Sequence, residues 1–237
     1  MQVREPLLGT RGEVVVFASE PSTAEAAEAT ALAEAERLEA IFTIFDPASA
    51  LHALRSTGTS EVPELNEVHR LAIDWAGRTS GAFHPGIEPV VELWANAQET
   101  QTLPSNDAIA EALSRVAQMS IQHLNLNGIA KGWIADQALS AALTAAGAAA
   151  TEAWLSLGGD LVHSGEGSLR VGIEDPHRPY DNVAPLVTVE ISNEALATSG
   201  SARRYWTIDG EHFSRVIDPR TGRPCLLYTS PSPRDRG

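Results

Sequence analysis

The sequence predicts an α+β fold, with helices in the first half of the chain and an antiparallel-rich sheet in the second half. Three observations support this prediction. Apolar residues recur at helical spacing before residue 120. Short alternating segments separated by Gly, Pro and Asp follow after residue 150, as in strands joined by tight turns. One alanine-rich helix lies between the two regions, and the chain has no internal repeat and no clear linker.

The first half is expected to begin with a strand at 13–18 (EVVVFA) and a long helix at 21–45. Ser22 and Glu25 match a capping box at the helix start. The Asp46-Pro47 pair that follows is expected to end the helix. Its buried stripe is expected to comprise Ala31, Ala35, Leu38, Phe42 and Phe45.

Two more helices are predicted before the β-rich half, at 63–78 and at about 105–118. A loop rich in Gly and Pro is expected between them, at 80–89. The apolar side of the first of these helices is expected to comprise Leu65, Val68, Ala72 and Trp75.

Residues 119–127 alternate like a strand and lead into a helix predicted at 128–147. The segment 153–165 predicts two strands around a Gly-Gly-Asp turn. The remaining strands are expected within 169–175, 185–192 and 204–218, with a turn at 218–224. We therefore expect one domain over residues 1–224. The tail, 225–237, has no periodicity and is expected to be disordered or foreign to the domain.

Composition excludes several classes of protein. The net charge of -14 argues against a nucleic-acid partner or an anionic membrane partner, which need a cationic face. Cys225 is the only cysteine, so a disulfide framework is impossible. No apolar run is long enough for a membrane span. With no apolar signal segment before Arg11, the chain as written is expected to be cytoplasmic, unless an export signal is missing from it.

The junction LNLNGIAKGW holds Lys131, the only lysine in a chain with sixteen arginines. Gly128 and Gly132 would let a ligand approach the backbone, and the N–H groups of a helix start attract phosphate oxygens. The spacing matches neither a Walker A loop nor G-x-G-x-x-G. The alternative is a helix opened by small residues, with a solvated lysine. The bias of the chain toward arginine favours a functional lysine.

Three other motifs are weaker. Asp160 of LGGD suits a ribityl or ribose hydroxyl, although an ordinary turn aspartate is as plausible. The ATSG segment at 197–200 offers hydroxyls to phosphate oxygens, and the IDPRTG segment at 217–222 is typical of a structural turn. The seven histidines show no metal-ligand spacing. No Ser-His-Asp arrangement or reactive cysteine can be argued.

Taken together, eight stretches in order resemble the ApbE family, the FAD:protein FMN transferases. They are LGT, FDPASALHAL, GAFHPGIEPVVELW, LNLNGIAKGWIAD, LGGDL, VGIEDP, ALATSG and SRVIDPRTGRP, from about Leu8 to Pro224. The resemblance implies that FAD is bound, its pyrophosphate is cut, AMP is released and FMN is attached to a Thr or Ser of an acceptor protein. It also implies a Mg²⁺ ion that bridges the pyrophosphate, and acceptors that are flavin-carrying subunits of redox complexes.

The resemblance also implies a set of site residues. The Gly128 carbonyl is expected to bind the metal, and the ATSG and IDPRTG segments to close over the pyrophosphate. The residues expected to bind the flavin nucleotide are Leu8, Phe45, Ala82, Phe83, His84, Asn125, Lys131, Asp160, Thr198, Ser199, Gly200, Ile217 and Asp218.

The chain departs from the family pattern at several places. His84 and Asn125 each replace an aspartate, and Arg215 replaces a histidine proposed to take the proton of the attacking hydroxyl. Arginine stays protonated, so Arg215 can stabilise phosphate charge but cannot act as a general base. The later family motif whose Asp and Thr bind the metal is absent, as in a truncated chain. The alternatives are therefore an FAD-binding protein without transfer activity, an FAD pyrophosphatase, or a fragment that does not fold stably.

Overall fold

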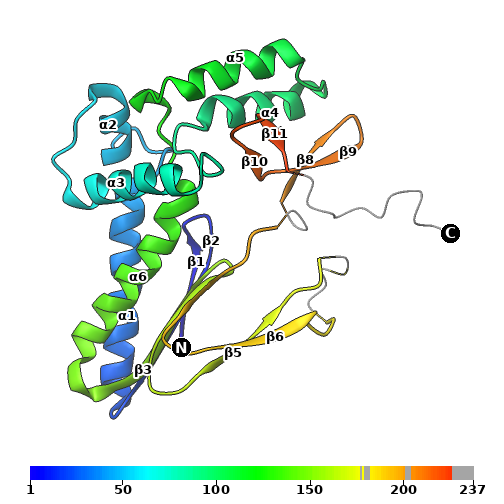
Figure 1. The fold of residues 1–237 in the computed structure, drawn as a ribbon. Coiled ribbons are helices and arrows are strands. Elements are labelled where there is room, and N and C mark those ends of the chain that lie inside the picture. Colours follow the sequence, from blue (N-terminus) through cyan, green and yellow to red (C-terminus); the bar gives the residue numbers. More distant parts are fainter. Residues whose placement is uncertain (177, 179–181, 201–203, 226–237) are drawn as a thin grey trace. The chain divides into compact units, whose positions relative to one another are not determined.

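The computed structural model describes residues 1–176, 178, 182–200 and 204–225. Helices and antiparallel strands are both present, so the predicted α+β class is confirmed (Figure 1). The helices are α1 (Pro21–Phe42), α2 (Ala50–Thr57), α3 (Pro63–Arg78), α4 (Glu88–Thr100), α5 (Asn106–Ala117) and α6 (Asn127–Ala146), with short 3-10 turns at Ile121–His123 and Gly147–Ala149. The strands are β1 (Gln2–Leu7), β2 (Thr10–Ala18), β3 (Ala150–Leu157), β4 (Asp160–Gly165), β5 (Leu169–Ile173), β6 (Val187–Ile191), β7 (Ala195–Ala197), β8 (Tyr205–Ile208), β9 (Glu211–Ser214), β10 (Ile217–Asp218) and β11 (Arg223–Pro224).

Contacts within the chain divide it into two compact units. Unit 1 comprises Met1–Val68, Leu126–Gly172 and Thr188–Thr198, and unit 2 comprises His69–Asn125, Ile173–Val187 and Ser199–Gly237. Each unit is built from three segments that are distant in the sequence. The expected tail boundary at residue 225 stays a prediction, because residues 226–237 lie outside the described part of the chain.

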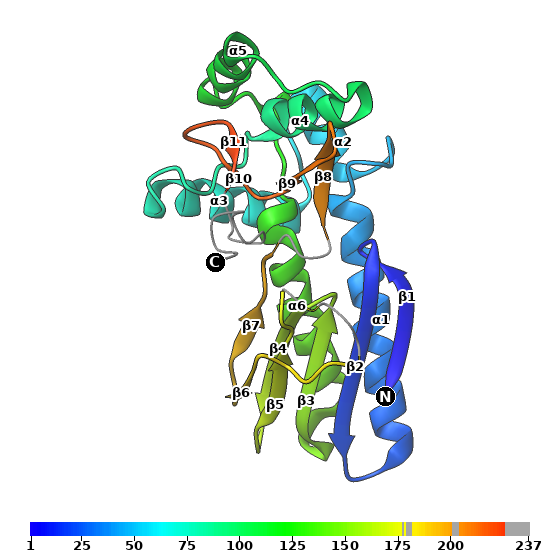
Figure 2. The same cartoon turned by 90° about the vertical axis from the view of Figure 1, so that its right-hand side faces the viewer.

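Unit 1 is built on a five-stranded antiparallel sheet with the strand order β1-β2-β3-β4-β7. Helices α1 and α6 pack against each other and cover one face of this sheet (Figure 2). Alternate residues of β2 and β3, such as Val14, Val16 and Leu155, are buried on that face. Between the helices, the rings of Phe42 and Trp133 meet edge to face with centroids 5.8 Å apart.

Helix α1 follows the predicted stripe with two corrections. Ala31, Ala35, Leu38 and Phe42 are buried, as expected. The helix ends at Phe42, so Phe45 lies beyond it and is 88% exposed rather than buried. The predicted capping box is also wrong, because Pro21 occupies the first turn, Glu20 is the N-cap, and no side chain caps the helix.

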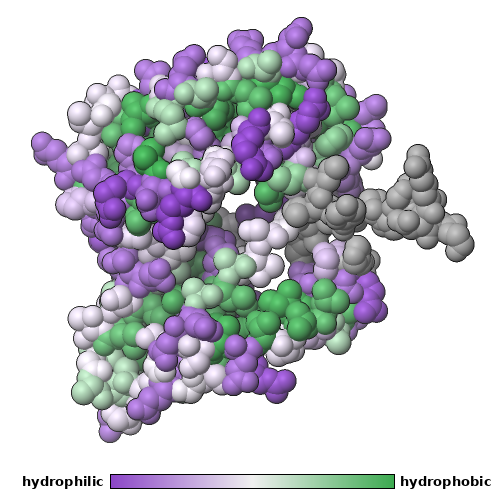
Figure 3. Space-filling view, viewed as in Figure 1, coloured by the Kyte–Doolittle hydropathy of each residue, from purple (hydrophilic) through white to green (hydrophobic). Residues whose placement is uncertain are grey.

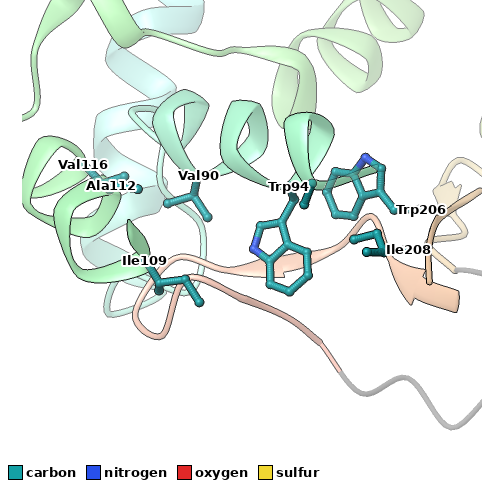
Figure 4. Packing of buried hydrophobic residues seen from close by; sticks show 8 residues of the cluster. Val90, Trp94, Ile109, Ala112, Val116, Trp206 and Ile208 are labelled. Carbon is teal, nitrogen blue, oxygen red and sulfur yellow. The ribbon is translucent and has the colours of Figure 1, made fainter. Parts of the chain in front are cut away.

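Unit 2 has its own apolar cluster, formed by α4, α5 and β8 (Figure 4). The indole of Trp94 stacks on Trp206, with centroids 6.2 Å apart, and donates its N–H to the carbonyl of Gly222 at 2.8 Å. The amide side chain of Gln101 pairs with the backbone of β8 by donating to the carbonyl of Thr207. These contacts attach the β8–β11 segment to the helices of this unit.

Several elements differ from the predictions. The alternating segment 119–127 forms a 3-10 turn and irregular backbone instead of a strand, and its last residue, Asn127, already begins α6. Leu124 and Leu126 are buried within it. Strand β1 and helices α2 and α4 were not predicted. Trp75 of α3 is 42% exposed rather than buried, with the guanidinium of Arg78 4.3 Å from its ring centroid.

On the face drawn in Figure 3, hydrophilic and apolar side chains are mixed, and apolar ones gather near β5 and β6 and again near α4 and α5. Leu186 and Val187 are exposed in this region. Within the described residues, every helix is too short or too polar to cross a membrane.

Candidate functional site

Two tight turns lie side by side at one end of the sheet in unit 1. Leu8-Gly9 joins β1 to β2, Gly158-Gly159 joins β3 to β4, and all four residues have positive φ angles. The pairing of Gly12 with Leu157 places both turns at the same sheet end. A Cβ on Gly158 would lie 2.1 Å from the Thr10 hydroxyl oxygen, so only glycine fits there.

The same sheet end holds Lys131 and Asp160, which sequence analysis singled out separately. The Lys131 ammonium lies 2.8 Å from the Asp160 carboxylate, and the two side chains are 29% and 21% exposed. Asp160 opens β4, where its backbone pairs with Leu157 on one side and Ala197 on the other. Thr198, which follows Ala197 directly, is exposed. The structure therefore gathers Leu8, Lys131, Asp160 and Thr198 at one end of this unit.

Helix α6 begins at Asn127, about one turn before Lys131. No side chain caps it, because its N-cap residue is Leu126. Gly128 is exposed in the first turn, where its carbonyl is directed along the helix axis. Gly132 is exposed, and a Cβ added there would find no atom within 4 Å outside its chain neighbours and the backbone of its own helix. The open space at Gly132 fits the expectation that a ligand approaches this turn.

Phe45 also belongs to unit 1, in the turn between α1 and α2. Its N–H donates to the hydroxyl of Thr43, and the following Asp46 and Ser49 form further local hydrogen bonds in the same turn. An exposed aromatic ring on such a hydrogen-bonded turn suits contact with a planar ligand.

In unit 2, the loop that contains Ala82, Phe83 and His84 lies next to Asn125. The Asn125 N–H donates to the carbonyl of Pro85 at 2.6 Å, and the His84 Nδ1 atom accepts the N–H of Gly86 at 3.1 Å. Nδ1 therefore carries no proton in this arrangement. Burial lowers the pKa of His84 below its ordinary value.

Glu88 adjoins the candidate site and is absent from the set of residues predicted from the sequence. Its carboxylate is buried in the first turn of α4 and accepts a hydrogen bond from the side-chain amide of Asn125. A carboxylate thus lies one hydrogen bond away from the position where the family has an aspartate. The sequence feature that could have indicated it is an acidic residue in the first turn of a helix. The feature is hidden because the Gly and Pro residues of 80–89 predict a loop there.

The IDPRTG segment forms the β10–β11 turn of unit 2. Asp218 accepts three hydrogen bonds from Arg220, each 2.9 Å long, and this partner lowers the pKa of the Asp218 carboxyl. Ile217 is half-buried beside it. The exposed guanidinium of Arg215 lies 5.9 Å from the ring centroid of Trp206. Ser199 and Gly200, also in this unit, are exposed and lie outside regular structure.

Metal ligands are sparse in the described part of the chain. There, no three His, Cys, Asp or Glu side chains come together as a metal site. Mg²⁺ usually takes only one or two protein oxygens and completes its shell with water and substrate phosphates. The Gly128 carbonyl, with a second lone pair, is compatible with one such contact.

Comparisons with known proteins agree with this architecture. The sequence profile of the ApbE family matches residues 8–230. The FAD:protein FMN transferase of Treponema pallidum is 29% identical over 259 residues, which cover 93% of this chain and 70% of that protein. That of Klebsiella pneumoniae is 28% identical over 244 residues, covering 92% and 68%.

A solved structure gives the same result for the fold. The crystal structure of the ApbE protein of Thermotoga maritima superposes with a TM-score of 0.77 at 25% identity, covering 94% of this chain and 79% of that one. The profile match alone spans most of the sequence. The chain therefore belongs to the ApbE family.

Proposed function

We propose that the protein is an FAD:protein FMN transferase, which moves FMN from FAD to a hydroxyl of an acceptor protein and releases AMP. The observation that carries the proposal is the family match over residues 8–230, together with relatives of that name. FAD is then the substrate, and a second protein is the acceptor. The lysine at the sheet end of unit 1 supplies a compact cation suited to a pyrophosphate.

The reaction exchanges one phosphorus–oxygen bond for another. The acceptor hydroxyl oxygen, which we assign to a Thr or Ser, forms a bond to the phosphorus of the FMN half. The bond from that phosphorus to the bridging oxygen breaks, AMP leaves with the bridging oxygen, and the hydroxyl proton passes to solvent. The protein accelerates such a step by positioning the groups and by neutralising charge on the phosphate oxygens.

Within unit 1, we assign Lys131 and Thr198 to the pyrophosphate, and Leu8 and Phe45 to the flavin ring. Within unit 2, Ala82, Phe83, His84 and Asn125 are assigned to the flavin, and Ser199, Gly200, Ile217 and Asp218 to the phosphate side. The exposure of Phe45 and the hydrogen bonds around Asn125 support these assignments.

Mg²⁺ is part of the proposal, as the ion that neutralises the pyrophosphate of the bound substrate. The Gly128 carbonyl is its proposed protein contact. The chemistry that such an ion supplies is stabilisation of negative charge on the phosphate oxygens.

A second candidate is an FAD-binding protein without transfer activity. It is favoured by Arg215, which stands at the family histidine and cannot accept a proton. An FAD pyrophosphatase, in which water replaces the acceptor hydroxyl, is the third.

One experiment separates these functions. Purified protein is incubated with FAD, with and without Mg²⁺ and with and without a purified candidate acceptor, while FAD binding, AMP release and the acceptor mass are measured. Transfer predicts AMP release and an acceptor heavier by one FMN less one water. AMP without an acceptor adduct indicates hydrolysis, and FAD binding without AMP indicates the flavin-holding protein. Absence of FAD binding would contradict all three.

A further inference from the structure

The ion pair of Lys131 and Asp160 joins a short side chain on a sheet strand to a long side chain on helix α6. The Asp160 backbone is held between β3 and β7, in the interior of the sheet. Lys131 reaches the carboxylate from α6 on a flexible four-carbon stem. The position of the Asp160 carboxylate therefore limits where the Lys131 ammonium can lie while the ion pair is formed.

The chemistry of the two cations explains why this position is a lysine. Arginine pairs with a carboxylate through two parallel N–H donors of its planar group, and this pairing fixes the direction of the remaining donors. An ammonium has three donors in a tetrahedral arrangement. At 2.8 Å one of them is directed to Asp160, and two remain for another acceptor.

The neighbourhood leaves room for such an acceptor. Both side chains retain solvent access, at 29% and 21% exposed, so a further acceptor can reach the ammonium from solvent. The chain as a whole is strongly acidic, with a net charge of -14, so a positioned cation matters for an anionic ligand.

We propose that Asp160 is a positioning residue, which holds the Lys131 ammonium so that two of its N–H donors face the pyrophosphate of FAD. The proposal rests on the proposed function, because it takes FAD as the ligand. It also reassigns Asp160: the carboxylate acts through Lys131 rather than by accepting a hydrogen bond from a ribityl or ribose hydroxyl.

Asp160→Asn distinguishes positioning from simple charge. The substitution removes a negative charge beside the pyrophosphate, so an account based on charge alone predicts tighter FAD binding. Positioning predicts weaker FAD binding, by about tenfold, because the ammonium is no longer held in place. Asp160→Glu, which restores the carboxylate, is expected to recover part of the loss.

A double-mutant cycle distinguishes positioning from direct contact. In a Lys131→Gln background, Asp160→Asn should cause no further loss of FAD affinity. Riboflavin, which carries the ribityl hydroxyls but no phosphate, should bind the parent and Asp160→Asn equally. Glu34→Gln, which breaks the Glu34–Arg37 ion pair of α1, serves as the matched control and should leave both ligands unaffected. Equal losses for riboflavin and FAD would overturn the proposal.

The single lysine also allows a test without ligand. Lysine labelled with ¹³C and ¹⁵N gives the side-chain signals of Lys131 alone. A fixed ammonium keeps the two ε-methylene protons in different surroundings, so the parent should show two shifts that merge in Asp160→Asn. A single averaged shift in the parent would contradict the positioning role.

FAD binding and the lysine spectrum together distinguish a failure of the proposed function from a failure of the positioning role. A parent that does not bind FAD contradicts the proposed function and the ligand named here, while the lysine spectrum still decides whether Asp160 fixes Lys131. A parent that binds FAD, beside an Asp160→Asn variant that binds it equally well or more tightly, overturns positioning and leaves the proposed function intact.

Discussion

At the scale of single residues, the charged side chains of the candidate site have defined neighbours. Lys131 is held by Asp160, and Asp218 is held by Arg220. Arg215 is exposed and lies over an aromatic ring. A sequence motif does not say where a side chain lies. The observed ion pairs do so for Lys131 and Asp218, because each charged group contacts a named partner.

Arg215→His is expected to raise the rate of FMN transfer by about tenfold or more, because a histidine can accept the hydroxyl proton near neutral pH. The measurement is the rate of acceptor labelling at saturating FAD. Arg215→Gln is the control, since it removes the cation without adding a base. A histidine variant no faster than the glutamine variant would contradict the prediction.

His84 is expected to make stability depend on pH. Because burial lowers its pKa, the folded protein takes up the proton only at a lower pH than the unfolded chain does. The stabilisation by neutral His84 is complete above the pKa of histidine in the unfolded chain, about 6.5. It is lost as the pH falls from that value toward the lower pKa of His84 in the folded protein. Protonation of Nδ1 would also break the bond from Gly86.

The measurement for His84 is urea unfolding between pH 5 and 8, roughly the range in which histidine titrates. His84→Asn keeps an acceptor for the Gly86 N–H but does not titrate, so its stability should vary less with pH than that of the parent. His69, whose pKa burial also lowers, contributes equally to both proteins and cancels in the comparison. Parallel profiles would count against this role of His84.

At the scale of elements, the turns at the end of the sheet position the site. The Gly158-Gly159 turn brings Asp160 into β4 and packs against Thr10 at the start of β2. The β1–β2 turn beside it carries Leu8. Helix α6 delivers Lys131 to the same end. The site in unit 1 thus depends on close packing between backbone turns.

Gly158→Ala is expected to lower the free energy of unfolding by about 2 kcal/mol or more. An alanine there combines the cost of a left-handed backbone with a clash against Thr10. Gly9→Ala is the matched control, since Gly9 has a similar φ angle but no atom within 4 Å of an added Cβ. Urea denaturation measures both variants, and equal losses would show that the clash with Thr10 is unimportant.

Gly132→Ala tests the open side of α6. In the free protein it should raise the free energy of unfolding by about 0.5–1 kcal/mol, because alanine is the better helix former and space is available. A ligand that approaches Gly132 would meet the new methyl group, so FAD affinity should fall at the same time. Thermal unfolding and FAD titration of the same preparation measure both effects. A variant that is more stable and binds FAD normally would place the ligand elsewhere.

At the scale of the whole molecule, the chain forms two compact units from interleaved segments. Unit 1 has the sheet and its two covering helices, and unit 2 has the cluster around Trp94 and Trp206. The predicted site residues are divided between the two units, and each unit holds some of them.

Trp94→Phe is expected to destabilise unit 2 selectively. The variant leaves the buried carbonyl of Gly222 without its indole donor, at a cost of about 1–3 kcal/mol. Hydrogen exchange followed by mass spectrometry should show faster exchange at Tyr205–Ile208. Exchange at Thr10–Ala18, in unit 1, should be unchanged. Equal acceleration in both segments would mean that the two units unfold together.

Much of the fold was predictable because its signals are local. Helices α1, α3, α5 and α6 each have a continuous pattern of helical period, and the Gly-Gly-Asp turn marks the junction of β3 and β4. The segment 119–127 was predicted wrongly because alternate leucines are buried equally well in a strand or in an irregular segment. Phe45 was placed on the buried stripe of α1 because the periodicity did not reveal that the helix ends at Phe42.

The sequence by itself determined the α+β class and the family resemblance, and it singled out one lysine whose role stays a prediction. It did not determine that Lys131 and Asp160 form a pair, that Asn125 bonds to Glu88, or that the segments assemble into two units. Periodicity and turn chemistry act between neighbours along the chain, and they can be read from one sequence. Contacts between distant segments depend on strand pairing and packing, and for this reason only the tertiary structure decided which charges meet.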